Sequence, residues 1–143
     1  MSTAAHQSAV LETSEALAVA RFRFALRRFE RHTDALVREC GLTPQRYLLL
    51  LAVYSAQATA GHATVSSIAD DLEMPQTTVT DLVARAVTVR LLDRRPAAED
   101  GRSAELTLSR EGERRLHRAI ATLNRDRAEL RRSLIEASRL FPE

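Results

Sequence analysis

The spacing of apolar and small residues between Val65 and Leu82 constrains the fold more than any other feature of this sequence. In a helix-turn-helix, the first helix carries apolar residues at positions four and eight and a small residue at position five, where the second helix crosses closely. With Ala69 at position five, the apolar positions four, eight, fifteen and eighteen are Ile68, Leu72, Val79 and Leu82. Glu73-Met74-Pro75 separates the two apolar faces, as a turn does. The segment therefore predicts two short helices joined by a tight turn.

The residues that follow this pair predict a β-hairpin. Leu91–Arg95 and Ala104–Leu108 alternate apolar and polar residues with period two. They flank Pro96–Arg102, whose proline and Asp-Gly are turn residues, so the hairpin has a seven-residue tip. Any helix pair can show the helix-turn-helix spacing by chance. A hairpin directly after the second helix is, however, the element order of a winged helix.

Two further helices are predicted before the pair. From about Leu11 to Glu39 the pattern is helical, and Gly41 ends it. Four apolar residues share one face of this helix: Phe22, Leu26, Phe29 and Leu36. Thr43-Pro44 then begins a second helix, with Thr43 as N-cap and Pro44 at the first helical position. Residues 47–54 are apolar on all sides, as in a buried strand, but the Leu and Ala content and the cap favour a central buried helix.

A long helix is predicted at the end of the chain. Ser109 is its N-cap, and it runs for about thirty residues from Arg110 toward Leu140. A heptad-like apolar seam follows it: Leu116, Ile120, Leu123, Leu130 and Leu134. Two long amphipathic helices in a small chain carry more apolar surface than one core can cover. We expect a partner subunit to bury the seam together with Phe22, Leu26 and Phe29.

Composition excludes several classes of protein. A chain of 143 residues fits one domain or two small lobes, and the single cysteine, Cys40, excludes an intramolecular disulfide framework. The four histidines show no ligand spacing and the four glycines form no phosphate loop, so we expect no metal, no cofactor and no catalytic residues. The longest apolar run, 47–56, is about half a bilayer span, and no signal peptide pattern is present. We therefore expect a cytoplasmic protein without a membrane partner.

The charges are distributed unevenly. All 21 cationic side chains are arginine, a planar fork suited to phosphate and base edges, against 19 acidic residues. The exclusive use of arginine is also what a biased genome composition produces. Between residues 64 and 84 there is no arginine, but Asp70, Asp71, Glu73 and Asp81 are present. Any attraction of this segment to nucleic acid phosphates must come from Arg85 and the hairpin.

Three runs carry a family resemblance: GLTPQRYLLLL (41–51), TVSSIADDLEMPQTTVTDLVARA (64–86) and LLDRRPAAEDGRSAELTLSREGERRL (91–116). Together they resemble the MarR family of transcriptional regulators. The resemblance implies a mostly α fold with a small β-hairpin wing, in which long N- and C-terminal dimerisation helices flank a winged helix-turn-helix. The dimerisation region would be 11–40 and 110–140, and the DNA-binding domain 44–109. Glu73 and Arg90 stand where the family commonly has glycine, so we expect positive φ at Glu73.

The family resemblance also implies a homodimer on a pseudo-palindromic operator, with repression relieved by a small, often aromatic, effector. Residues at the start of the second helix of the pair face base edges in the major groove. With the phosphate-contacting side chains and the wing, the candidate DNA-binding residues are Ser66, Gln76, Thr77, Thr78, Thr80, Asp81, Arg85, Arg94, Arg95, Asp100 and Arg102. Arg102 resembles the family's minor-groove arginine, held by Asp100, although both residues can equally form a solvated turn pair. Of Arg94 and Arg95, one can reach DNA while the other pairs with Asp93 or Glu105.

The effector site is the least constrained element of this interpretation. Tyr47 and Tyr54 lie seven residues apart on one face of the central helix, where a tyrosine can stack on an aromatic ring. Arg46 can hold a carboxylate with its guanidinium. Both tyrosines can equally be ordinary core-edge residues. Cys40 closes a helix at its electronegative end, which does not favour a reactive thiolate. The alternative function is a winged-helix module that binds proteins and has weak affinity for DNA.

Overall fold

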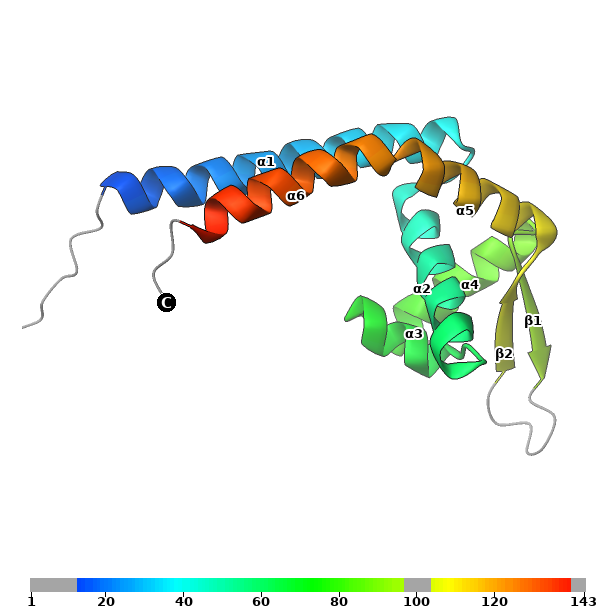
Figure 1. The fold of residues 1–143 in the computed structure, drawn as a ribbon. Helices are drawn as coiled ribbons and strands as arrows, with labels where there is room; N and C mark the ends of the chain where they lie inside the picture. The colour runs from blue at the N-terminus through cyan, green and yellow to red at the C-terminus, as the bar shows by residue number, and fades with distance from the viewer. Residues whose placement is uncertain (1–12, 97–103, 140–143) are drawn as a thin grey trace, which may run out of the picture. The chain divides into compact units, whose positions relative to one another are not determined.

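The computed structural model describes residues 13–96 and 104–139. The chain forms two compact units, one from His32 to Asn124 and one that combines residues 13–31 with 125–139. The elements, in chain order, are α1 (Thr13–Glu39), α2 (Pro44–Ala60), α3 (Val65–Leu72), α4 (Gln76–Thr88), β1 (Leu92–Pro96), β2 (Ala104–Leu108), α5 (Arg110–Thr122) and α6 (Asn124–Ser138). This mostly helical architecture with a two-stranded hairpin confirms the predicted fold class (Figure 1).

Helix α2 is the centre of the 32–124 unit, as predicted. It begins as expected, because the Thr43 hydroxyl accepts a hydrogen bond from the Arg46 backbone amide at 3.2 Å and Pro44 occupies the first turn. Leu49, Leu50 and Val53 are fully buried where α2 packs against α3, α4, α5 and β2. Within the described residues no single helix is long and apolar enough to cross a bilayer, although α2 and α3 pass that test as a pair bent by 112°.

The helix-turn-helix forms where the spacing predicts it. Its five pattern residues line the interface between α3 and α4, with Ile68, Ala69, Val79 and Leu82 buried and Leu72 partly buried. A capping box of Thr64 and Ser67 begins α3, which explains why this eight-residue helix starts where it does. Glu73 ends it with φ of 52°, which confirms the predicted positive φ at a residue other than glycine.

The wing is an antiparallel pair with Leu92 opposite Leu108 and Pro96 opposite Ala104. The amide of Leu106 also donates a hydrogen bond of 2.8 Å to the Ala63 carbonyl, which attaches β2 to the connection between α2 and α3. Arg90, the residue that stands in place of glycine before the wing, has φ of 60°. The predicted tip, with Asp100 and Arg102, lies outside the described residues.

The prediction of one continuous helix from Arg110 to Leu140 is wrong. Helix α5 ends at Thr122, Leu123 caps it with its amide directed to the carbonyls of Ala119 and Ala121, and α6 begins at Asn124. The predicted partner-facing seam is also divided. Leu116 and Leu123 are fully buried in the core of their own chain, and Ile120 packs against that core, because β2 and α2 cover this face of α5. The compact unit is therefore wider than the predicted 44–109 segment.

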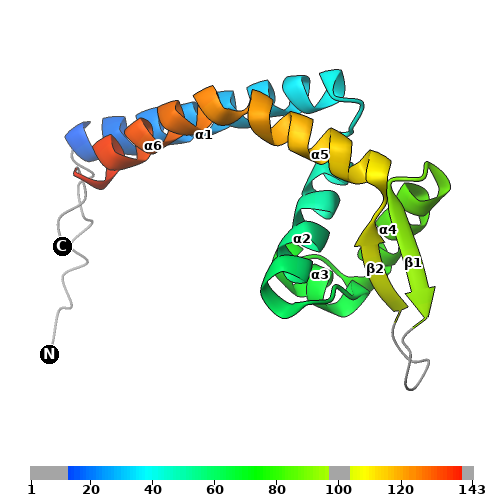
Figure 2. The same cartoon turned by 45° about the vertical axis from the view of Figure 1, so that its right-hand side comes forward.

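The second unit consists of α1 up to Arg31 and of α6 from Arg125 onward. These two helical segments run alongside each other in both views (Figures 1 and 2). Their sequences leave large apolar side chains at the surface: Leu17, Val19, Phe24, Leu134 and Ile135 are between 42% and 61% exposed. The residues expected to meet a partner, Phe22, Leu26 and Phe29, are half-buried within this chain. The two helices therefore leave part of their apolar surface uncovered when they pack against each other.

Candidate nucleic-acid interface

Helix α4 buries one face and presents the other to solvent. Val79, Leu82, Val83 and Ala86 lie in the core, which leaves the opposite side of the helix free. The predicted contact residues on the helix pair are all exposed: Ser66, Gln76, Thr77, Thr78, Thr80, Asp81 and Arg85. The structure thus brings these seven side chains to the surface of one helix-turn-helix, in the arrangement that a recognition helix requires.

Some of these polar groups bond within the protein. The Gln76 amide nitrogen donates a long hydrogen bond of 3.4 Å to the Ser66 hydroxyl, which joins the starts of α3 and α4. The Thr80 hydroxyl donates to the Gln76 carbonyl at 2.8 Å, one turn earlier in the same helix. Among the described residues, Thr77, Thr78 and Asp81 form no side-chain hydrogen bond or ion pair. Their polar atoms are available to a ligand.

The cations lie beyond this surface, as the sequence indicates. Arg85 is exposed one turn after Asp81, and Arg94 and Arg95 are exposed on β1. The expectation that Arg94 or Arg95 pairs with Asp93 or Glu105 is not met within the described part of the wing. The strand therefore presents both guanidiniums to solvent, where phosphates can reach them.

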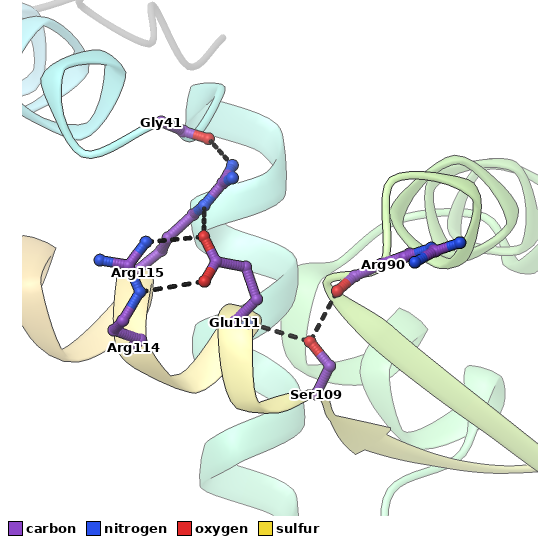
Figure 3. Close-up of polar contacts among 7 residues, drawn as sticks. Gly41, Arg90, Ser109, Glu111, Arg114 and Arg115 are labelled. Atoms are coloured by element: carbon purple, nitrogen blue, oxygen red, sulfur yellow. Dashed lines mark hydrogen bonds and ion pairs between the residues drawn. The ribbon is translucent and has the colours of Figure 1, made fainter.

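A hydrogen-bonded junction joins the end of α4, the root of the wing and the start of α5 (Figure 3). The Ser109 hydroxyl donates to the Arg90 carbonyl at 2.7 Å and accepts from the Gly112 amide at 3.0 Å, while the Ser109 amide donates to the Leu91 carbonyl at 3.1 Å. Gly112 is required by this contact, because a Cβ at that position would lie 2.1 Å from the Leu91 oxygen. The predicted N-cap Ser109 thus has a second, tertiary role.

An ion-pair cluster in the first two turns of α5 completes the junction (Figure 3). Glu111 accepts hydrogen bonds from Arg114 at 2.7 and 3.0 Å and from Arg115 at 2.6 Å, and the two guanidiniums lower the pKa of the Glu111 carboxyl to about 2. The same carboxylate raises the pKa of Arg114. Arg115 also donates to the Gly41 carbonyl at 2.7 Å, which connects α5 to the corner between α1 and α2.

Sequence reasoning missed Glu111, Arg115 and the tertiary role of Ser109. A signal existed for one part of the junction, since a glycine in the first turn of a helix indicates a close backbone approach. Nothing in the sequence pairs Arg115 with Gly41, because the two residues are 74 positions apart.

The candidate effector residues occupy different environments. Tyr47 is buried in the core, whereas Tyr54 is 42% exposed and meets the His117 ring edge to face at 5.8 Å between centroids. Arg46 is half-buried in the first turn of α2. Cys40 is buried with the core residues and is a free thiol. Within the described residues no cluster of three or more His, Cys, Asp or Glu side chains is placed to hold a metal ion.

A helix-turn-helix whose second helix is exposed, followed directly by a β-hairpin, defines a winged-helix protein of the DNA-binding regulator class. The sequence model of the MarR family matches residues 41–103, which span both helices of the pair and the first wing strand. The family model and the structural matches support a MarR-type winged-helix regulator, and the resemblance drawn from the sequence is confirmed. Members of this family are regulators rather than enzymes.

Solved structures share this fold. A MepR variant from S. aureus has a TM-score of 0.68 at 20% identity, over 76% of this chain and 78% of that one. MOSR from M. tuberculosis, in complex with DNA, has a TM-score of 0.61 at 23% identity, over 76% and 75%. A MarR variant from E. coli, complexed with operator DNA, has a TM-score of 0.65 at 16% identity, over 76% and 75%. No curated protein matches the sequence.

Proposed function

We propose that this chain is a cytoplasmic, homodimeric repressor that binds a pseudo-palindromic operator and is released by a small aromatic effector. One winged helix per subunit enters a half-site, with α4 in the major groove and the wing arginine Arg102, oriented by Asp100, in the minor groove. The observation that carries the proposal is the exposed face of α4, whose six candidate contact residues all reach solvent while its opposite face is buried. Two structures with this fold, MOSR and MarR, were solved with DNA bound.

The exposed apolar residues of α1 and α6 support a homodimer. Phe24 is 61% exposed and Leu17 is 52% exposed, and side chains of this kind rarely gather on a monomer without a partner surface. A second copy of the same two helices is the occupant we propose. Light scattering at micromolar concentration should give about 32 kDa, twice the chain mass of 15.9 kDa. A mass of about 16 kDa would exclude the dimer.

The effector is proposed to contact Tyr47, Tyr54 and Arg46. A small aromatic acid should release DNA at concentrations that also raise the melting temperature, because it binds only the folded protein. Tyr54 is the accessible member of the set, so Tyr54→Phe should weaken release more than Tyr47→Phe does. If both variants release DNA as the parent protein does, the effector site lies elsewhere.

One observation favours the second candidate function, a winged helix that binds a protein and has weak affinity for DNA. Asp70, Asp71, Glu73 and Asp81 are all exposed on or beside the recognition helix, and they repel a polyanion. Fluorescence anisotropy of the purified protein with promoter DNA, measured across a salt series, separates the two functions. A repressor binds promoter DNA more tightly than unrelated DNA, with an affinity that falls steeply as salt rises, whereas a protein-binding module binds both kinds of DNA weakly and equally.

A further inference from the structure

Four exposed residues form a continuous stripe along α4. Thr77, Thr80, Asp81 and Ala84 have the spacing i, i+3, i+4 and i+7, so they share one helical face, and all four are exposed. We call these four residues the reading stripe. Because the first turns of a recognition helix approach base edges, the reading stripe is the part of α4 whose chemistry decides which bases fit.

The reading stripe has few hydrogen-bond donors. Ala84 has no polar side-chain atom and the carboxylate of Asp81 only accepts. The Thr80 hydroxyl hydrogen is directed to the Gln76 carbonyl at 2.8 Å, so Thr80 presents a methyl group and lone pairs. The neighbouring Gln76 amide nitrogen is directed to Ser66. Thr77 is therefore the one stripe residue whose hydroxyl hydrogen has no partner among the described residues.

Guanine is a poor partner for such a surface. In the major groove guanine presents two acceptors, N7 and O6, which are normally read by arginine or lysine. Cytosine presents the N4 amino group, a donor, and a carboxylate accepts from it. The C·G pair oriented with cytosine toward Asp81 is therefore the pair that the stripe satisfies best.

The negative charge of Asp81 strengthens the preference for this base pair. No ion pair joins Asp81 to Arg85 or to any other described residue, so its negative charge is uncompensated where it would meet DNA. A carboxylate that approaches phosphates and base acceptors is repelled unless a donor meets it. We infer, on the basis of the proposed function, that Asp81 is the specificity-determining residue of this regulator and that it selects a cytosine in each operator half-site.

The test is selection of bound sequences from random double-stranded DNA by the full-length protein, followed by sequencing, for the parent and two variants. Asp81→Asn replaces an acceptor with a group that also donates, and asparagine pairs with adenine N6 and N7. The preferred base at one position of each half-site should change from cytosine to adenine. Thr88→Val is the matched control: Thr88 lies at the end of α4 outside the candidate contact residues, and its hydroxyl donates to the Ala84 carbonyl at 3.0 Å, so its removal should leave the preference unchanged.

Binding measurements then distinguish specificity from structure. Asp81→Asn should lower the ratio of specific to non-specific affinity by roughly 5- to 150-fold, as expected for one well-formed base contact. The same variant should bind non-specific DNA at least as tightly as the parent, since it removes a negative charge. A fold defect would instead weaken both kinds of binding, and equal melting temperatures of parent and variant exclude it.

The remaining outcomes contradict either the role of Asp81 or operator binding itself. If the parent protein selects no C·G pair in either half-site, or if Asp81→Asn selects the same sequences as the parent, Asp81 does not determine specificity although the protein is a DNA-binding regulator. If the parent protein enriches no sequence, the proposed operator binding itself is wrong, and the role of Asp81 is wrong with it.

Discussion

Substitution of Gly112 tests whether the junction between wing and α5 holds the winged helix together. In Gly112→Ala the new Cβ would lie 2.1 Å from the Leu91 carbonyl oxygen and 3.0 Å from its carbon. Real Cβ contacts below 3.0 Å are essentially absent, so the two backbones must separate by at least 0.9 Å, the difference between 3.0 and 2.1 Å. That movement stretches the 3.1 Å hydrogen bond from the Ser109 amide to the same oxygen.

The expected loss of stability is about 1–3 kcal/mol. Overpacking of a tight contact costs about 1–3 kcal/mol, and a weakened buried hydrogen bond adds about 1 kcal/mol. The higher helix propensity of alanine offsets at most about 1 kcal/mol. For a chain of this length the net change lowers the melting temperature by about 4–12 °C, which far-UV circular dichroism measures.

Gly61→Ala is the matched control for Gly112→Ala. Gly61 has φ of +77°, and the space that a Cβ would occupy there has no other atom within 4 Å, so the substitution tests left-handed backbone strain without a clash. It should destabilise the protein by about 1 kcal/mol. The reasoning is refuted if Gly112→Ala is as stable as the parent protein, or if it loses less stability than Gly61→Ala.

Three further predictions address the junction and the wing. Ser109→Ala removes both the cap of α5 and the bond to the Arg90 carbonyl, and urea denaturation should show a loss of about 1–2 kcal/mol; no loss would contradict the role of Ser109. The ionised Glu111 carboxylate stabilises the folded protein at pH values above its ordinary pKa of 4.5, and this stabilisation is lost as the pH falls toward its folded pKa of about 2. The melting temperatures of the parent and Glu111→Gln should therefore converge across this pH range. A difference that stays constant with pH would argue against the ion pairs. Arg102→Ala should weaken operator binding by about 1–3 kcal/mol without a change in melting temperature, and unchanged affinity in a titration would remove Arg102 from the interface.

Local sequence signals determined most of the helices and their ends. The Thr43-Pro44 start of α2, the turn after Leu72 and the Ser109 cap all appear where the sequence predicts them, because each depends on hydrogen bonds or backbone angles within a few residues. The five helix-turn-helix positions are likewise predictable, since the close crossing of two helices demands a small residue at Ala69 and apolar residues around it. The exposure of the candidate contact residues on α4 follows from the same periodicity.

Tertiary packing decided the features that depend on distant residues. The seam from Leu116 to Leu134 reads as one surface in the sequence, yet its first half is buried in the chain's own core, because α2 and β2 cover α5. Tyr47 and Tyr54 share a helical face, but only Tyr47 is buried. The bond from Arg115 to the Gly41 carbonyl joins residues 74 positions apart. Periodicity specifies which side of a helix is apolar, whereas the fold alone specifies what covers that side, because the covering elements come from elsewhere in the chain.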